Sequence, residues 1–143
     1  MGRFLLAAAV VVAAAVVALV VERRRPDAPT QGPPSASWPA PTQLDRADFP
    51  RSGTPWLVAV FTSATCQSCA EALSRANVLD SEAVAVEEAE YAARGDLHKR
   101  YQIEAVPTIV VADAEGVVRA SFVGPPSAAD LWAAVAGART DQE

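Results

Sequence analysis

An unbroken run of 18 apolar residues, from Phe4 to Val21, lies near the start of this 143-residue chain. As an α-helix it would be roughly 27 Å long at 1.5 Å per residue, which is close to the thickness of a bilayer core. A helix buried in a soluble core normally carries polar residues on one face, and this run has none. A cleaved signal peptide is the main alternative, but the run is longer than an ordinary signal-peptide core and is followed by Glu22 and Arg23 instead of a small-residue cleavage site. We therefore expect residues 1–25 to be a single-pass anchor in the cell membrane, in contact with the lipid bilayer through residues 4–21.

The basic residues that flank this run predict its orientation. Three arginines, at positions 23–25, follow the run, whereas Arg3 and the terminal amine precede it. Because the cytoplasmic flanks of membrane helices are enriched in Lys and Arg, we expect the rest of the chain to face the cytoplasm. The opposite, exported orientation is the alternative.

Residues 26–43 have the composition of a tether. Eight of the 11 prolines of the chain lie between positions 26 and 55, and Gly, Ser, Thr and Gln fill much of the intervening sequence. Such a segment buries too little apolar surface to fold and favours extended conformations. Beyond residue 26 the chain has 8 basic and 16 acidic side chains, a formal charge of −8. This charge argues against nucleic-acid binding and against a face that lies on anionic lipid.

Strands and helices alternate over residues 44–138, and residues 139–143 are expected to form a tail. A continuous apolar run at 56–61 predicts a strand buried on both faces. The later signals predict a helix over 69–79, a strand at 84–86, a helix over 92–101, strands at 107–112 and 117–123 around a turn at 113–116, and a last helix that begins after Ser127 and ends near Ala136, before Gly137. This order is typical of an α/β layer with helices on both faces of a sheet.

The two cysteines of the chain lie where the first strand meets its helix. Cys66 and Cys69 are separated by Gln67 and Ser68 and can close a small disulfide ring. The N-terminus of a helix favours a thiolate on the first sulfur, which makes Cys66 the expected nucleophile and the more shielded Cys69 the expected resolving thiol. Incidental cysteines or half a metal site are the alternatives, although two cysteines and the single histidine, His98, are too few for a structural zinc site.

The sequence around these cysteines resembles the thioredoxin family, and the resemblance extends over residues 44–138. The matching segments are the strand at 57–61 that leads into Cys66–Cys69, the segment from Tyr101 to Thr108, Glu115-Gly116 in the hairpin, and 122–124. The resemblance implies a thioredoxin-like fold, with a central mixed sheet and helices on both faces. It also implies a cis peptide bond before Pro107, next to a redox-active disulfide that needs no other cofactor. The substrate-binding residues that it implies are Thr65, Gln67, Ser68, Val106, Pro107 and Gly124.

Several positions depart from the thioredoxin pattern. Thr65 stands where the family has tryptophan before the first cysteine, and Thr62 replaces an aromatic residue. The family's buried aspartate corresponds to Val60, and its accompanying lysine to about Glu88. Without this acid–base pair we expect Cys69 to resolve mixed disulfides slowly, as in a dedicated membrane-tethered protein rather than a general reductase. The 11 arginines against one lysine, together with the anchor and tether, more loosely resemble actinobacterial membrane-bound thioredoxin-like proteins.

Other conspicuous residues are expected to be structural. We expect His98 to be a solvated helix residue, Trp56 to belong to the core and Trp132 to dock the last helix, whereas Trp38 in the tether has no assigned role. The acidic residues Glu87, Glu88 and Glu90 are interpreted as the polar end of a strand, with a proton-accepting role for Glu90 as the alternative.

These patterns predict a monomeric, membrane-tethered thiol–disulfide oxidoreductase that acts on protein thiols or disulfides at or near the membrane. Two alternatives remain. The first is a non-catalytic module that holds a partner through the surface around Pro107, although such a module needs neither cysteine. The second is an exported reductase for cytochrome maturation.

Overall fold

The computed structural model of this protein describes residues 39–140. The expected anchor, the arginine triplet, Trp38 and most of the tether lie outside the described residues, as do the last three residues of the tail. Within residues 39–140 no helix is both long and apolar enough to cross a bilayer.

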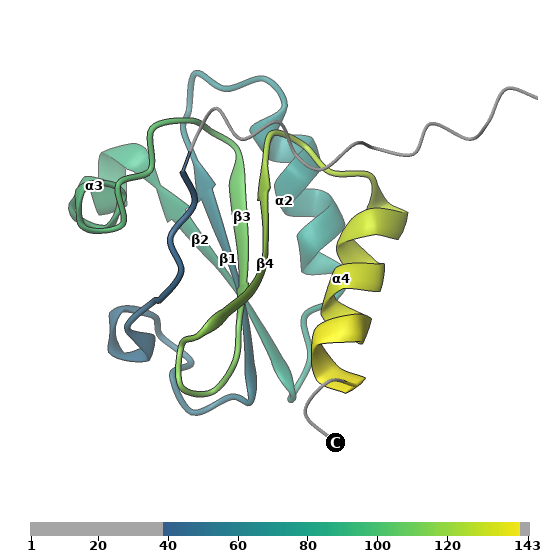
Figure 1. Cartoon of the computed structure of the whole chain (residues 1–143). Coiled ribbons are helices and arrows are strands. Elements are labelled where there is room, and N and C mark those ends of the chain that lie inside the picture. The colour runs from purple at the N-terminus through teal and green to yellow at the C-terminus, as the bar shows by residue number, and fades with distance from the viewer. Residues whose placement is uncertain (1–38, 141–143) are drawn as a thin grey trace, which may run out of the picture. The chain divides into compact units, whose positions relative to one another are not determined.

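Four strands and three α-helices follow a short 3-10 helix, η1 (Arg46–Asp48) (Figure 1). The strands are β1 (Trp56–Thr62), β2 (Val84–Glu90), β3 (Thr108–Ala112) and β4 (Val118–Val123), and the helices are α2 (Cys69–Asn77), α3 (Tyr91–Arg100) and α4 (Ala128–Thr140). The sheet order is β2-β1-β3-β4. Strand β1 is parallel to β2 and antiparallel to β3, and β4 is antiparallel to β3. The expected mixed sheet is therefore confirmed.

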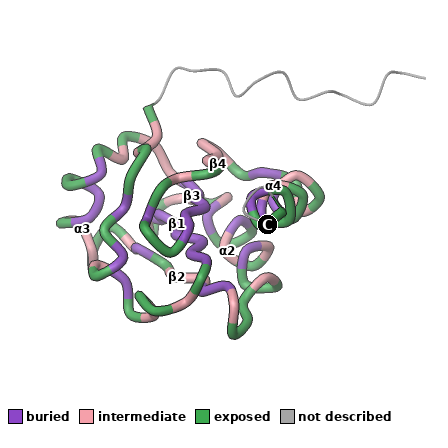
Figure 2. The backbone as a smooth tube through the Cα atoms, turned by 60° about the horizontal axis from the view of Figure 1, so that its bottom comes forward, coloured by how far each residue is buried: buried purple, intermediate pink, exposed green. Residues whose placement is uncertain are grey.

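Helices cover both faces of this sheet, as the sequence predicted. Successive side chains of a strand point to opposite faces, so Leu57, Ala59 and Phe61 join the core under α3. The alternate residues of β1 join a second core with α2 and α4, in which Val58 and Val60 are fully buried. Figure 2 shows the buried strands between α3 on one side and α2 with α4 on the other. The buried strand β1 thus carries the chain from the middle of the core to the cysteine loop.

Two of the expected elements continue four residues further along the chain than predicted. Strand β2 continues to Glu90 instead of ending at Val86, because its parallel pairing with β1 extends to Thr62, and its edge position leaves room for polar side chains. Helix α4 continues through Gly137 to Thr140. It does so because Ala138 extends the buried stripe formed by Leu131 and Val135, and this packing outweighs the low helix propensity of one glycine.

The expectation for His98 is also wrong. Its side chain is 3% exposed, and its Nε2 lies 2.8 Å from the carbonyl oxygen of Ala89. The imidazole packs edge-on against the rings of Phe61 and Tyr91. Arg94 has non-helical backbone angles inside α3. A regular helical period, read from the sequence, therefore does not predict which residues after Arg94 face the core.

The two described tryptophans behave as expected. Trp56 is buried in the core. Trp132 is exposed, and its Nε1 donates a hydrogen bond to the carbonyl oxygen of Arg75, which links α4 to α2.

Candidate active site at the Cys66–Cys69 disulfide

The two cysteines lie in the loop that connects β1 to α2 and in the first turn of that helix. They form a disulfide with a Cα–Cα distance of 5.4 Å. The amide of Cys66 donates to the carbonyl oxygen of Ser63, and that of Cys69 donates to the carbonyl oxygen of Cys66. Helix α2 begins at Cys69, as the sequence predicted, so Cys66 lies just before the helix. It still lies at the N-terminal end, where the helix dipole favours negative charge.

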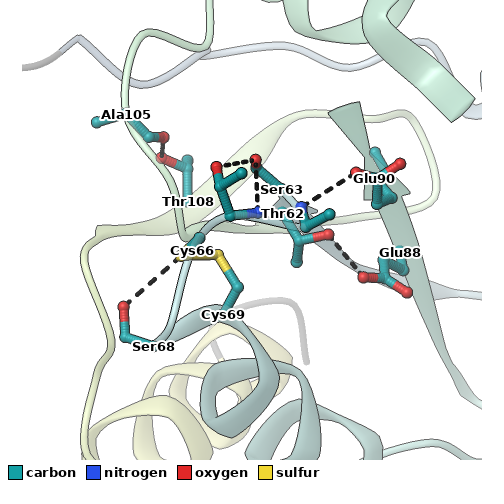
Figure 3. Close-up of a disulfide and its surroundings, with 12 residues drawn as sticks. Thr62, Ser63, Cys66, Ser68, Cys69, Glu88, Glu90, Ala105 and Thr108 are labelled. Atoms are coloured by element: carbon teal, nitrogen blue, oxygen red, sulfur yellow. Dashed lines mark hydrogen bonds between the residues drawn. A yellow bond between two sulfur atoms is a disulfide. The ribbon is translucent and has the colours of Figure 1, made fainter. Parts of the chain in front are cut away.

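The two sulfur positions differ in their accessibility. Cys69 is 3% exposed, whereas Cys66 is only half-buried. The hydroxyl oxygen of Ser68 lies 3.7 Å from the Cys66 sulfur (Figure 3). A partner from solution can therefore reach Cys66 more readily than Cys69, which is the asymmetry that a nucleophilic and a resolving thiol require.

The loop that precedes β3 brings Pro107 close to the disulfide loop. The Val106–Pro107 peptide bond is cis, which confirms the expectation from the sequence. Thr108, the next residue, pairs with Phe61 near the end of β1, and β1 leads directly into the cysteine loop. Pro107 is buried, and its carbonyl oxygen accepts a hydrogen bond of 2.8 Å from the amide of Gly124. The fold therefore brings together three parts of the predicted site that are far apart in the sequence.

The remaining predicted substrate-binding residues lie around this centre. Thr65 and Gln67 are exposed, and the hydroxyl oxygens of Thr65 and Ser63 are 3.1 Å apart. Val106 is partly buried and packs against the core under α3. Their contacts with a substrate stay a prediction.

Acidic side chains approach the site from β2. The Thr62 hydroxyl donates a hydrogen bond of 2.6 Å to Glu88, an interaction that sequence reasoning missed. The sequence does not predict this hydrogen bond, because it does not reveal the offset between the paired strands β1 and β2. Glu90 accepts hydrogen bonds from the amide of Ala64, in the cysteine loop (Figure 3), and from the first amides of α3. Among residues 39–140 no cluster of His, Cys, Asp or Glu is suited to hold a metal ion.

Comparison with solved structures identifies the architecture. The chain is similar to the germline-specific thioredoxin Deadhead from Drosophila melanogaster, with a TM-score of 0.53 and 24% identity over 60% of this chain and 83% of that one. It is also similar to thioredoxin from Fasciola hepatica, with a TM-score of 0.53 and 18% identity over 60% of this chain and 83% of that one. Mitochondrial thioredoxin 3 from Saccharomyces cerevisiae gives a TM-score of 0.52 and 18% identity over 60% of this chain and 81% of that one.

The fold is thioredoxin-like. At these identities the likeness shows the fold alone, and neither a protein-family model nor a curated protein sequence matches the chain. A thioredoxin-like fold that carries a Cys-x-x-Cys disulfide at this position supports thiol–disulfide oxidoreductase activity.

Proposed function

We propose that this protein is a membrane-tethered thiol–disulfide oxidoreductase that acts on proteins at or near the membrane. The observation that carries the proposal is the unequal exposure of the two disulfide-bonded cysteines where β1 leads into α2. A reactive pair needs one accessible and one shielded sulfur, and the residues of this loop supply both.

The disulfide exchange takes place in two steps. The Cys66 thiolate attacks one sulfur of a partner disulfide, a mixed disulfide forms, and the second partner sulfur leaves as a thiolate. The Cys69 thiol then loses its proton and attacks the Cys66 sulfur, which forms the Cys66–Cys69 disulfide and releases the partner as a dithiol. Two electrons pass to the partner, and the same steps in reverse oxidise a partner dithiol.

The membrane tether is supported by the sequence. The apolar run at 4–21 has the length of a bilayer-spanning helix, and the basic triplet at 23–25 favours a cytoplasmic domain. A tether from position 26 to about 42 would reach roughly 50 Å at about 3.1 Å per residue. The anchor would therefore raise the concentration of membrane-associated partners around Cys66.

A trapping experiment tests the redox role. The full-length Cys69→Ser variant should accumulate membrane proteins covalently bound to Cys66, because the thiol that resolves the mixed disulfide is missing. These adducts should dissociate in dithiothreitol and should be absent in the Cys66→Ser/Cys69→Ser double variant. Partners that stay bound to the double variant would instead support the non-catalytic module.

A labelling experiment tests the orientation. After mild reduction, a thiol reagent that cannot cross membranes should leave Cys66 unlabelled in intact cells and should label it after the cells are opened. Labelling in intact cells would place the domain on the exported side and favour a role of the cytochrome-maturation type.

A further inference from the structure

Resolution of the mixed disulfide releases a proton from Cys69, and the buried strand β1 offers no carboxylate to accept it. Cys69 must lose its thiol proton before it attacks the mixed disulfide. β1 carries no carboxylate along its whole length, and Val60 near its end is fully buried. A carboxylate that serves Cys69 therefore has to come from a neighbouring element.

The sheet places Glu88 on the side of Cys69. In the parallel register Glu88 pairs with Val60, and Glu90 pairs with Thr62. Val84 and Val86 of β2 pack in the core with α2, and alternation along the strand gives Glu88 the same face. Helix α2, which begins at Cys69, covers that face (Figure 1).

Thr62, the last residue of β1, is the buried residue that contacts this carboxylate. Its side chain is 2% exposed, and its hydroxyl donates the hydrogen bond of 2.6 Å to Glu88. Figure 3 shows the hydroxyl directed toward Glu88, with Thr62 drawn between that carboxylate and the disulfide. A hydroxyl that donates one hydrogen bond can also accept one. Glu88 itself is exposed, so water can remove a proton that it has received.

Building on the proposed oxidoreductase function, we propose that Thr62 and Glu88 take up the proton of Cys69 during resolution. The thiol proton passes to the Thr62 hydroxyl oxygen, directly or through one water, while the hydroxyl proton moves to the Glu88 carboxylate. The Cys69–Cys66 bond forms, the bond from Cys66 to the partner breaks, and the partner leaves as a thiolate. Glu88 then releases its proton to solvent. Thr62 therefore acts as a proton relay and Glu88 as the general base, and neither forms a covalent bond to a reacting sulfur.

The other charged groups around this pair are engaged elsewhere or lie on another face. Glu90 binds backbone amides of the cysteine loop and of α3. Glu87, one residue away, lies on the opposite face of the sheet and forms a hydrogen bond with Arg51. On α2 the remaining charged residues, Glu71 and Arg75, bond to each other.

Two-phase reaction with 5,5′-dithiobis(2-nitrobenzoate) separates the steps. The reduced full-length protein should release one equivalent of coloured thiol when Cys66 attacks and a second when Cys69 resolves. At pH 7, Glu88→Gln and Thr62→Val should slow the second phase roughly tenfold or more and leave the first unchanged. The difference should disappear at alkaline pH, where Cys69 ionises without help. Thr62→Ser should retain the second phase, and Glu87→Gln is the control that removes the neighbouring charge from the other face.

The outcomes distinguish the two proposals. If Glu88→Gln and the parent protein had the same rates in both phases, only the proton-acceptor role would be overturned. A slow second phase that persists at alkaline pH would also overturn it, because a distorted loop would have that effect. Loss of both phases in the unaltered protein would instead overturn the oxidoreductase function.

Discussion

Replacing Cys66 by serine is expected to lower the rate of disulfide exchange by about 10³-fold or more. The reason is that Cys66 is the half-buried member of the disulfide and stands at the N-terminal end of α2, whereas Cys69 is 3% exposed. The serine variant would leave only a shielded thiol. The measurement is the rate of reduction of a small soluble disulfide by the pre-reduced protein, which does not depend on the membrane.

Cys69→Ser is the matched variant for this prediction. It should attack the same disulfide at close to the normal rate and then stop at the mixed-disulfide stage, because the first step needs Cys66 alone. Mild alkylation of the reduced parent protein should likewise modify Cys66 first. Equal alkylation of the two cysteines, or faster exchange by the Cys66→Ser variant than by Cys69→Ser, would reverse the assigned roles.

Gly116→Ala is expected to lower the free energy of unfolding by roughly 2–4 kcal/mol. Gly116 has a φ of +81° in the turn between β3 and β4, a conformation that side chains disfavour. A Cβ atom there would lie 1.9 Å from the carbonyl oxygen of Leu44, whose amide donates to the Gly116 carbonyl oxygen. The backbone segments at Gly116 and Leu44 would have to move apart. This movement would disturb the core, because the Leu44 side chain is fully buried. Chemical denaturation measures the change.

Gly137→Ala is the control with the opposite expected sign. Gly137 lies inside α4, and a Cβ atom there would meet nothing within 4 Å. Alanine should therefore stabilise the protein by about 0.5–1 kcal/mol through its better helix propensity. Equal effects of the two substitutions would show that the close contact at Gly116 does not constrain the turn.

Signals confined to a few neighbouring residues predicted most of the elements near the site. The apolar run after Pro55 corresponds to β1, and the turn at 113–116 joins β3 to β4. Ser127 caps α4, since its hydroxyl oxygen accepts a hydrogen bond from the amide of Asp130. These signals can be recognised in the sequence because strand alternation, turns and helix caps each depend on residues only a few positions apart.

The resemblance to thioredoxins, in contrast, predicted how distant parts of the chain meet. It placed Pro107 beside the cysteines and implied its cis peptide bond, which the structure contains. Composition and spacing do not contain that information, because an X-Pro bond at the start of a strand is compatible with either isomer.

The amino-acid sequence by itself therefore determined the order of the elements, the disulfide loop at the end of a buried strand and the unequal shielding of Cys66 and Cys69. Only the tertiary structure decided the burial of His98, the extension of α4 to Thr140 and the hydrogen bond between Thr62 and Glu88. Each of these depends on which faces pack and on the offset between paired strands. The Thr62–Glu88 bond joins residues 26 positions apart, and a shift of one residue in the β1–β2 register would turn the Glu88 side chain to the opposite face of the sheet.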